Sequence, residues 1–255
     1  SGDTSGNTPA VETAGVFPEV SPDESPKNPD TLTSCLAGWS NYASAEDEPQ
    51  VVMELLQKQK AKGHCNFFDS MPQLLEYLQV DSAVLTKLAL ITKVKADGTK
   101  KHRLIWDLLR SEVNATVSLT ERIVLSRIQD AVDDASDLLR QGQGDLEWLV
   151  LDIADAFHNI PMLPAERRFT CGKVGETFIV FEVLCMGGKS SPNIWGRFAA
   201  AIGRILASIF DPNGFRSEIY VDDPLMAVVG SIPRRQKLLT VALLALGVLN
   251  FPLAW

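Results

Sequence analysis

The sequence lacks the residue spacings of several common binding sites. Its four cysteines form no CxxC pair, and with the three histidines they complete no zinc-binding pattern. We therefore expect these cysteines to be buried or free thiols in a reducing compartment. Gly188-Lys189-Ser190 matches the end of a phosphate-binding P-loop, but Val183 stands where that motif requires its first glycine. The sequence therefore excludes a P-loop nucleotide site.

Long hydrophobic runs and a secretory signal are also missing. The longest apolar stretch, residues 238–249, is interrupted by Thr240 and Gly247 and is too short to cross a bilayer. The first residues have neither the basic start nor the apolar run of a signal peptide. We expect no membrane partner, and an intracellular location, cytoplasmic or nuclear, rather than secretion.

Basic residues are scarce at the start of the chain, where the first fifty residues hold nine acidic side chains and one basic one. The formal net charge is −8, and the rest of the chain is neutral. Residues 1–31 are rich in Pro, Ser, Thr, Gly, Asp and Glu, so they have little apolar surface to offset the entropy of ordering. We expect residues 1–31 to form a disordered acidic leader. The neutral remainder is compatible with an anionic partner.

The remaining residues predict a mixture of helices and strands. Apolar periodicity, capping residues and helix-ending glycines predict helices over residues 51–62, 71–78, 121–139, 190–210 and 233–246. Runs of β-prone residues bounded by turn signals predict strands over residues 88–94, 103–106, 148–153, 177–184, 216–221 and 225–229. We expect Thr120 to cap the third helix, residues 148–153 to form a buried strand, and Gly247 to end the last helix.

The order of these elements predicts an α+β fold. From residue 148 onward it is strand, connector, strand, helix, hairpin, helix, which is typical of a ferredoxin-like antiparallel sheet backed by helices. Residues 32–147 are expected to form N-terminal helices and a β-hairpin at residues 88–107. Residues 148–255 are expected to form the second folded part of the chain.

Three aspartates are the candidates for chemistry. Asp222 and Asp223 directly follow an apolar, β-prone run, and Asp152 follows another. Carboxylates at strand ends can converge on divalent metal, and two ions about 3.5–4 Å apart can clamp the attacking and leaving oxygens of a phosphoryl displacement. Magnesium is usually held by one or two carboxylates together with substrate phosphates. An Asp-Asp pair alone is more often a solvated turn, so the neighbouring motifs decide.

Those motifs resemble the reverse transcriptases of the retroelement type. Residues 95–107 resemble the fingers hairpin of that family, and residues 151–157 (Leu-Asp-Ile-Ala-Asp-Ala-Phe) resemble its first palm motif. Residues 186–192 (Met-Gly-Gly-Lys-Ser-Ser-Pro) resemble the second palm motif, and residues 220–223 (Tyr-Val-Asp-Asp) resemble the third. The resemblance implies polymerase fingers and palm, with a ferredoxin-like palm sheet at residues 148–255 and the chain ending before the thumb.

The resemblance also implies a set of site residues. The catalytic residues are Asp152, Asp222 and Asp223, which together with Ile153 bind two Mg²⁺ ions, for which Mn²⁺ can substitute. The nucleotide-binding residues are Lys95, Arg103, Asp155, Ala156, Phe157, Met186 and Gly187, and the template and primer residues are Tyr220, Ser191 and Pro192. Lys95 and Arg103 suit this role because both cations bind phosphate oxygens. The other interpretation of this pair is a solvated cationic hairpin that protects a sheet edge.

The implied activity is RNA-directed DNA polymerisation from an RNA template, a DNA primer and deoxynucleoside triphosphates. Two features depart from the family. Met186 stands where many relatives have glutamine, and Pro224 directly follows the Asp pair and removes one donor from the strand ladder. Two alternatives stay open, namely an RNA-directed RNA polymerase with a similar palm and a decayed copy that binds nucleic acid without catalysis.

Phe157 should decide between deoxyribose and ribose. It lies where the family carries an aromatic residue under the incoming sugar, and a ring there clashes with a 2′-hydroxyl that it cannot hydrogen-bond. We expect Phe157→Val to raise ribonucleotide incorporation relative to deoxynucleotide in primer extension. Unchanged discrimination would assign Phe157 to the core instead. A parent chain that already prefers ribonucleotides would favour the RNA polymerase alternative.

Overall fold

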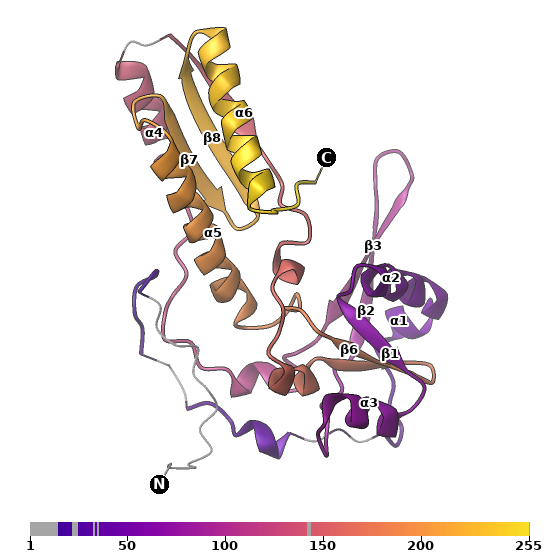
Figure 1. Cartoon of the computed structure of the whole chain (residues 1–255). Helices are drawn as coiled ribbons and strands as arrows, with labels where there is room; N and C mark the ends of the chain where they lie inside the picture. The colour runs from indigo at the N-terminus through magenta and orange to yellow at the C-terminus, as the bar shows by residue number, and fades with distance from the viewer. Residues whose placement is uncertain (1–14, 22–24, 33, 35, 142–143, 255) are drawn as a thin grey trace. The chain divides into compact units, whose positions relative to one another are not determined.

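The computed structural model describes residues 15–21, 25–32, 34, 36–141 and 144–254. It is an α+β protein whose strands form small antiparallel sheets (Figure 1). The chain divides into two units, each assembled from separate segments. The first unit contains Val20–Thr120 and Phe157–Ser191, and the second contains residues 15–19, Glu121–Ala156 and the residues from Pro192 onward. This division differs from the expected boundary at residue 147.

The first unit holds a three-stranded sheet and a separate hairpin. Its helices are α1 (Ala43–Glu46), α2 (Pro49–Ala61) and α3 (Met71–Leu78), and its strands are β1 (Cys65–Phe68), β2 (Leu88–Val94), β3 (Lys100–Trp106), β5 (Cys171–Val174) and β6 (Thr177–Phe181). The sheet order is β1-β6-β5, and β2 pairs with β3. The predicted hairpin is confirmed, because Asp97 accepts bonds from the backbone and hydroxyl of Thr99 while Gly98 takes a φ of +80°.

Strand β6 is the centre of the first unit. Its alternate side chains enter two hydrophobic clusters, with Ile179 packed in the cluster that includes Leu56 of α2 and Val180 in the cluster that includes Leu74 of α3. The two helices lie on opposite sides of this strand (Figure 1). The expectation that residues 177–184 belong to the same sheet as residues 148–153 is therefore wrong. Strand β6 is already paired on both edges and buried on both faces.

The second unit is a three-stranded antiparallel sheet with helices. Its strands are β4 (Asp145–Val150), β7 (Phe215–Tyr220) and β8 (Asp223–Gly230), and its helices are α4 (Ile128–Arg140), α5 (Ser191–Ile209) and α6 (Ile232–Val248). The sheet order is β4-β8-β7. Strand β8 is central and almost wholly buried, and Leu138 of α4 packs against its Ala227 and Val229. The predicted hairpin around the two aspartates is confirmed.

The strand expected at residues 148–153 is neither buried nor correctly bounded. Strand β4 spans Asp145–Val150, and the side chains of Trp148 and Val150 are 40% and 63% exposed. The reason is its place at the edge of the sheet, where it pairs with β8. An apolar run is therefore insufficient to predict burial on both faces when the strand is at an edge.

Two helix boundaries also differ from expectation. Residues 121–127 are not helical, and α4 begins at Ile128, where Arg127 and Asp130 form a reciprocal cap in place of the expected Thr120. Residues 121–127 are instead non-helical chain within the second unit, where the Ser126 hydroxyl donates to Glu218. At the other end, α6 continues through Gly247 to Val248.

The expected disordered leader falls partly outside the described residues, since residues 1–14 and 22–24 are not described. The described residues of the leader are bonded to the folded chain. Val20 N donates to Thr120 O at 2.8 Å, and Arg168 forms an ion pair with Asp30 at 2.5 Å. In the described part of the chain, no helix combines the length and apolarity that a membrane crossing needs.

A buried ion pair holds the segment before α4 in place. The Glu121 side chain is fully buried, accepts a bond from Gly15 N at 2.6 Å and pairs with Arg197 of α5 at 3.0 Å. Removing one partner of a buried pair leaves the other charge uncompensated, which costs about 3–5 kcal/mol. We therefore expect Glu121→Ala to lower the free energy of unfolding by about that amount in urea titrations.

Glu147→Ala is the matched control, because Glu147 also pairs with an arginine, Arg235 at 2.8 Å, but is 46% exposed. Exposed pairs contribute about 0–1 kcal/mol. Equal losses in the two variants would contradict the structural role of Glu121.

Candidate metal-binding carboxylate site

A two-residue loop carries the first of the aspartates. Tyr220 of β7 pairs with Asp223 of β8, so Val221 and Asp222 are the central residues of the hairpin turn. Val221 has a φ of 57°. Two-residue hairpin loops favour turns with positive φ at the first central position, although a β-branched residue rarely adopts it. The hairpin therefore requires a positive φ at Val221, a conformation that valine disfavours.

The chain that follows β4 brings Asp152 beside this turn. Beyond β4 the chain continues the ladder, with Leu151 N donating to Pro224 O and Ile153 N donating to Asp222 O, both at 2.9 Å. This register places Asp152 directly opposite Asp223, in a position without ladder hydrogen bonds between the two. Side chains of such pairs share one face of the sheet, with Cβ atoms about 4.5–5.5 Å apart. Two carboxylates far apart in sequence are thus neighbours.

Proline at position 224 does not interrupt this ladder. It lacks a donor, but its carbonyl still accepts the bond from Leu151 N, and Ile219 pairs with it across the hairpin. Pro224 is buried in the second position of β8. The departure from the family pattern at this residue therefore leaves the alignment of Asp152 and Asp223 intact.

Asp152 and Asp222 act electrostatically on Asp223. Partial burial raises the pKa of Asp223, and the negative charges of Asp222 and Asp152 raise it further. A raised carboxyl pKa means that the folded site disfavours the ionised form. A bound cation would relieve this repulsion.

The donor chemistry of the site fits magnesium. In the described residues, no three or more His, Cys, Asp or Glu side chains are arranged to hold a metal ion by themselves. Magnesium, however, takes oxygen ligands and is usually bound through one or two carboxylates, substrate phosphates and water. Asp152 and Asp223 would supply two such carboxylates from opposite strands, and Asp222 lies next to them in the turn.

A short segment after α6 supports Asp152 from its other side. Ala254 N donates to Asp152 O and Ala154 N donates to Pro252 O, each at 2.8 Å, and Ile153 forms a bridge with Leu253. The Asp152 segment is thus hydrogen-bonded on both edges, and Ile153 is buried between its neighbours. Sequence reasoning missed this support, because residues 252–254 carry no strand pattern of their own.

The second unit also holds four other predicted site residues, Asp155, Ala156, Pro192 and Tyr220. Asp155 adopts a left-handed backbone with a φ of 52°, and Ala156 is buried. Tyr220 is 54% exposed beside the turn, and Pro192 lies in the first turn of α5.

The other predicted residues lie in the first unit. Lys95 and Arg103 are exposed on the β2–β3 hairpin, Phe157 is half-buried, Met186 is 50% exposed, and the Ser191 hydroxyl donates to Cys185 O at 2.9 Å. Gly187 has a φ of +101°, and a Cβ there would lie 2.6 Å from Trp106 O. A glycine is therefore required at position 187 by both backbone conformation and space.

Sequence reasoning missed Asn114, which lies in the 3₁₀ helix Val113–Thr116 and bonds to the loop around Gly187. Its side-chain amide donates to Gly187 O at 2.9 Å and accepts from Lys189 N at 2.8 Å. The same side chain thus fixes both sides of Gly188. Nothing in the sequence around Asn114 signals this contact, which spans more than seventy residues.

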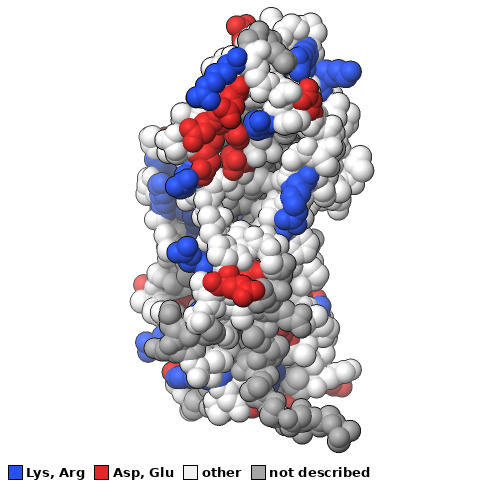
Figure 2. Space-filling model, turned by 90° about the vertical axis from the view of Figure 1, so that its left-hand side faces the viewer, with Lys and Arg blue, Asp and Glu red and all other residues white. Residues whose placement is uncertain are grey.

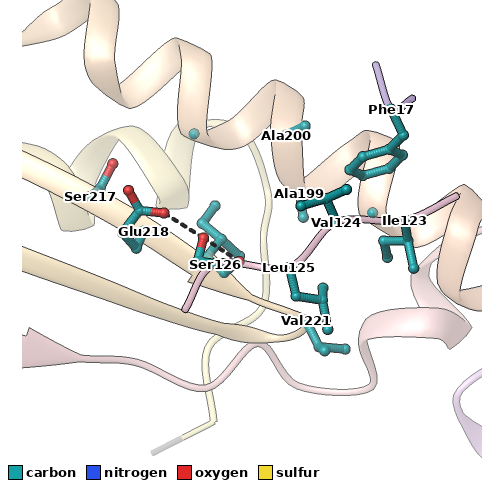
Figure 3. Close-up of a pocket in the computed structure, with 13 residues that line it drawn as sticks. Phe17, Ile123, Val124, Leu125, Ser126, Ala199, Ala200, Ser217, Glu218 and Val221 are labelled. Atoms are coloured by element: carbon teal, nitrogen blue, oxygen red, sulfur yellow. Dashed lines mark hydrogen bonds between the residues drawn. The ribbon is translucent and has the colours of Figure 1, made fainter. Parts of the chain in front are cut away.

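A pocket lies beside the turn within the second unit (Figure 3). Its volume is ≈190 Å³, and small residues of α5 form one wall while Val221 and Leu125 lie at one end. Glu218 of β7 and Ser126 form a hydrogen bond at the opposite end of the view (Figure 3). Ala199, Ala200, Gly196 and Gly203 are the small residues of α5 that line it.

Two comparisons with known proteins give no family for this chain. No protein-family model matches the chain, and no curated protein matches it. The functional proposal therefore rests on the motifs and on the geometry of the carboxylates.

The pKa of Asp223 gives a test by stability. A carboxyl whose folded pKa is raised destabilises the fold as pH rises from its unfolded pKa, about 3.9, through the folded value. We expect Asp223→Asn to melt at a higher temperature than the parent at pH 7 without divalent metal, because the variant removes the repulsion from Asp152 and Asp222. The difference should vanish as pH falls below about 3.9.

Asp81→Asn is the control, since Asp81 is an exposed aspartate of the first unit. It should melt like the parent throughout this pH range. An Asp223→Asn variant that is less stable than the parent at pH 7 would show that the three carboxylates do not repel one another.

Proposed function

We propose that the chain is the fingers and palm portion of an RNA-directed DNA polymerase. One observation carries this proposal. Asp152 lies directly opposite Asp223 on paired strands, and Asp222 is in the adjoining two-residue turn. The first and third palm motifs of the resemblance therefore meet at the same end of one antiparallel sheet. Chance carboxylates in unrelated loops would not be expected to converge in this way.

The carboxylates would act by binding and positioning. Asp152 and Asp223 would hold metal between opposite strands, and Asp222 would complete the acidic surface at the turn. When bound, two magnesium ions would lower the pKa of the primer 3′-hydroxyl and stabilise the leaving pyrophosphate oxygens. The fold itself would hold the 3′-hydroxyl near the α-phosphorus, because orientation supplies much of the catalysis in such transfers.

The charge distribution supports one orientation of the nucleic acid on the second unit. Acidic side chains gather in the upper part of the face shown in Figure 2, with basic side chains beside them. Helix α4 contributes Asp133 and Asp137 as exposed residues to this acidic surface. Phosphate backbones avoid such a surface. Template and primer are therefore expected on the aspartate edge of the sheet and away from α4.

The β2–β3 hairpin is the proposed phosphate-binding element of the first unit. Its strands and tip carry Lys93, Lys95, Lys100, Lys101 and Arg103. Lys93 and Lys101 lie directly opposite each other in the register, so like charges are placed side by side. Such a pair is unfavourable unless an anion lies between the side chains, which supports a triphosphate as the occupant.

Asp222→Asn tests the proposal directly. The measurement is extension of a DNA primer on an RNA template with deoxynucleoside triphosphates and Mg²⁺. We expect the variant to lose at least about 10²–10³-fold in rate, the range for removing one group that stabilises transition-state charge. Circular dichroism should be unchanged, because the Asp222 backbone bond to Ile153 does not use the side chain.

Asp133→Asn is the matched control on the exposed face of α4 and should extend as the parent does. Extension retained in Asp222→Asn would contradict the proposed role. A parent chain that binds primer–template but never extends it would favour the decayed, non-catalytic alternative.

A further inference from the structure

A tryptophan of α5 bonds directly to the turn that carries the aspartates. Trp195 is only 1% exposed, and its indole Nε1–H donates to Val221 O at 2.7 Å. Val221 lies between Tyr220 and Asp222. The peptide unit that receives this bond therefore also contains the backbone nitrogen of Asp222.

This carbonyl has no partner in the regular strand ladder. In a two-residue hairpin loop the ladder closes between the flanking residues, which here are Tyr220 and Asp223. The carbonyl of the first central residue points away from that pair. The indole thus satisfies an acceptor that the sheet leaves out.

The backbone at this carbonyl is also in a disfavoured conformation. Val221 has a φ of 57°, a region that β-branched residues rarely adopt and that persists when surrounding contacts over-determine it. The ≈190 Å³ pocket borders Val221 (Figure 3), so side-chain packing on that side is incomplete. Hydrogen bonding therefore contributes more than side-chain packing to holding the turn in this conformation.

The sheet fixes the neighbouring peptide units but not this one. Ile153 N binds Asp222 O and Leu151 N binds Pro224 O, each from β4's extension. Trp195 binds from the helix side. Rotation of the Val221–Asp222 peptide would convert one hairpin turn type into another and redirect the Asp222 side chain while both sheet bonds remained.

We propose that Trp195 is a positioning residue, whose indole N–H holds the Val221–Asp222 peptide in the orientation that directs Asp222 toward the metal site. This inference rests on the proposed polymerase function of the three aspartates. Trp195 would touch neither nucleotide nor metal. Its effect would appear in metal affinity and in kcat, with the KM for nucleotide little changed.

The test compares Trp195→Phe with the double variant Trp195→Phe/Val221→Gly. Phenylalanine keeps an apolar ring but lacks the donor, and glycine adopts positive φ without strain. We expect Trp195→Phe to weaken Mn²⁺ binding, measured by electron paramagnetic resonance, about 3- to 10-fold, the effect of one hydrogen bond. The glycine should restore much of this loss. A purely structural tryptophan would not be rescued, because Val221→Gly removes further apolar volume.

A second measurement needs no metal and so separates this inference from the proposed function. The ¹⁵N–¹H amide resonance of Asp222 reports the orientation of the peptide in question. It should shift in Trp195→Phe and return toward the Val221→Gly position in the double variant. If these shifts occur but the parent does not bind Mn²⁺, the positioning role of Trp195 would be supported and the metal site overturned.

Trp148→Phe is the control, because Trp148 lies on β4 in the same unit and is 40% exposed. It should change neither the Asp222 resonance nor Mn²⁺ affinity. A folded Trp195→Phe variant with both quantities unchanged would overturn the proposal. If Trp195→Phe does not fold, the double variant is compared with Val221→Gly alone. The positioning role of Trp195 predicts equal Mn²⁺ affinity in those two proteins, and unequal affinity would overturn it.

Discussion

Antiparallel pairing between the β4 segment and β8 determines where every acidic group of the site lies. The register places Asp152 opposite Asp223 and lets Ile153 bind the carbonyl of Asp222. Side chains alternate between the two faces of a strand, so a slip of one residue would turn Asp152 to the other face. The position of Asp222 follows from the same register, because the turn between Tyr220 and Asp223 contains only Val221 and Asp222. The site is thus a consequence of register more than of any single side chain.

The register itself is held by apolar burial farther along β8. Met226, Ala227, Val228 and Val229 are each at most 1% exposed, and burial of such side chains contributes about 1.5–3 kcal/mol for each large one. The acidic end of the strand opposes this, because repulsion raises the pKa of Asp223. The strand is therefore stable at one end and electrostatically strained at the other. Functional groups are commonly placed at such strained ends, where a ligand relieves the strain.

Local signals predicted the elements whose stability is local. Asp97 and Gly98 predicted the β2–β3 hairpin, and Pro72 in the first turn supported the prediction of α3, because turn and cap bonds form between near neighbours. These interactions are visible in the sequence because each spans only a few residues. The candidate site was predicted from the resemblance of two short motifs, residues 151–157 and 220–223, and the pairing that brings Asp152 beside Asp223 is not local.

Contacts between distant residues explain what the sequence did not reveal. The periodic apolar residues after Glu121 favour a helix, but the buried pair with Arg197 and the Ser126–Glu218 bond hold residues 121–127 extended. Strand β6 joined another sheet because β1, far earlier in the chain, occupies its edge. Tertiary packing overrode intrinsic preference in both cases.

Trp195 and Asn114 belong to the same class of long-range contact, and they show how a motif depends on residues outside it. Each bonds to a backbone carbonyl of a motif loop, at Val221 and Gly187 respectively. Backbone carbonyls are identical at every position, so no residue type in the loop encodes the need for a donor. The hydrogen-bond donor comes from a separate element, and the residue pattern of that element reflects its own packing. A motif can thus be intact in sequence while its geometry is lost through a substitution elsewhere.

The charge of the site leads to a final consequence for the order of binding. Three carboxylates that repel one another favour any cation that binds the folded chain, and such a ligand stabilises the fold by mass action. A triphosphate alone would add negative charge to an acidic surface, whereas a triphosphate that carries metal would neutralise it. The acidic side chains of α4 are relieved in another way, because Asp137 pairs with Arg140 at 2.6 Å and Asp134 pairs with Arg216 of β7 at 3.4 Å. Under the proposed function, the edge formed by Asp152 and Asp223 would therefore be the place where metal-bound phosphate gains most from binding.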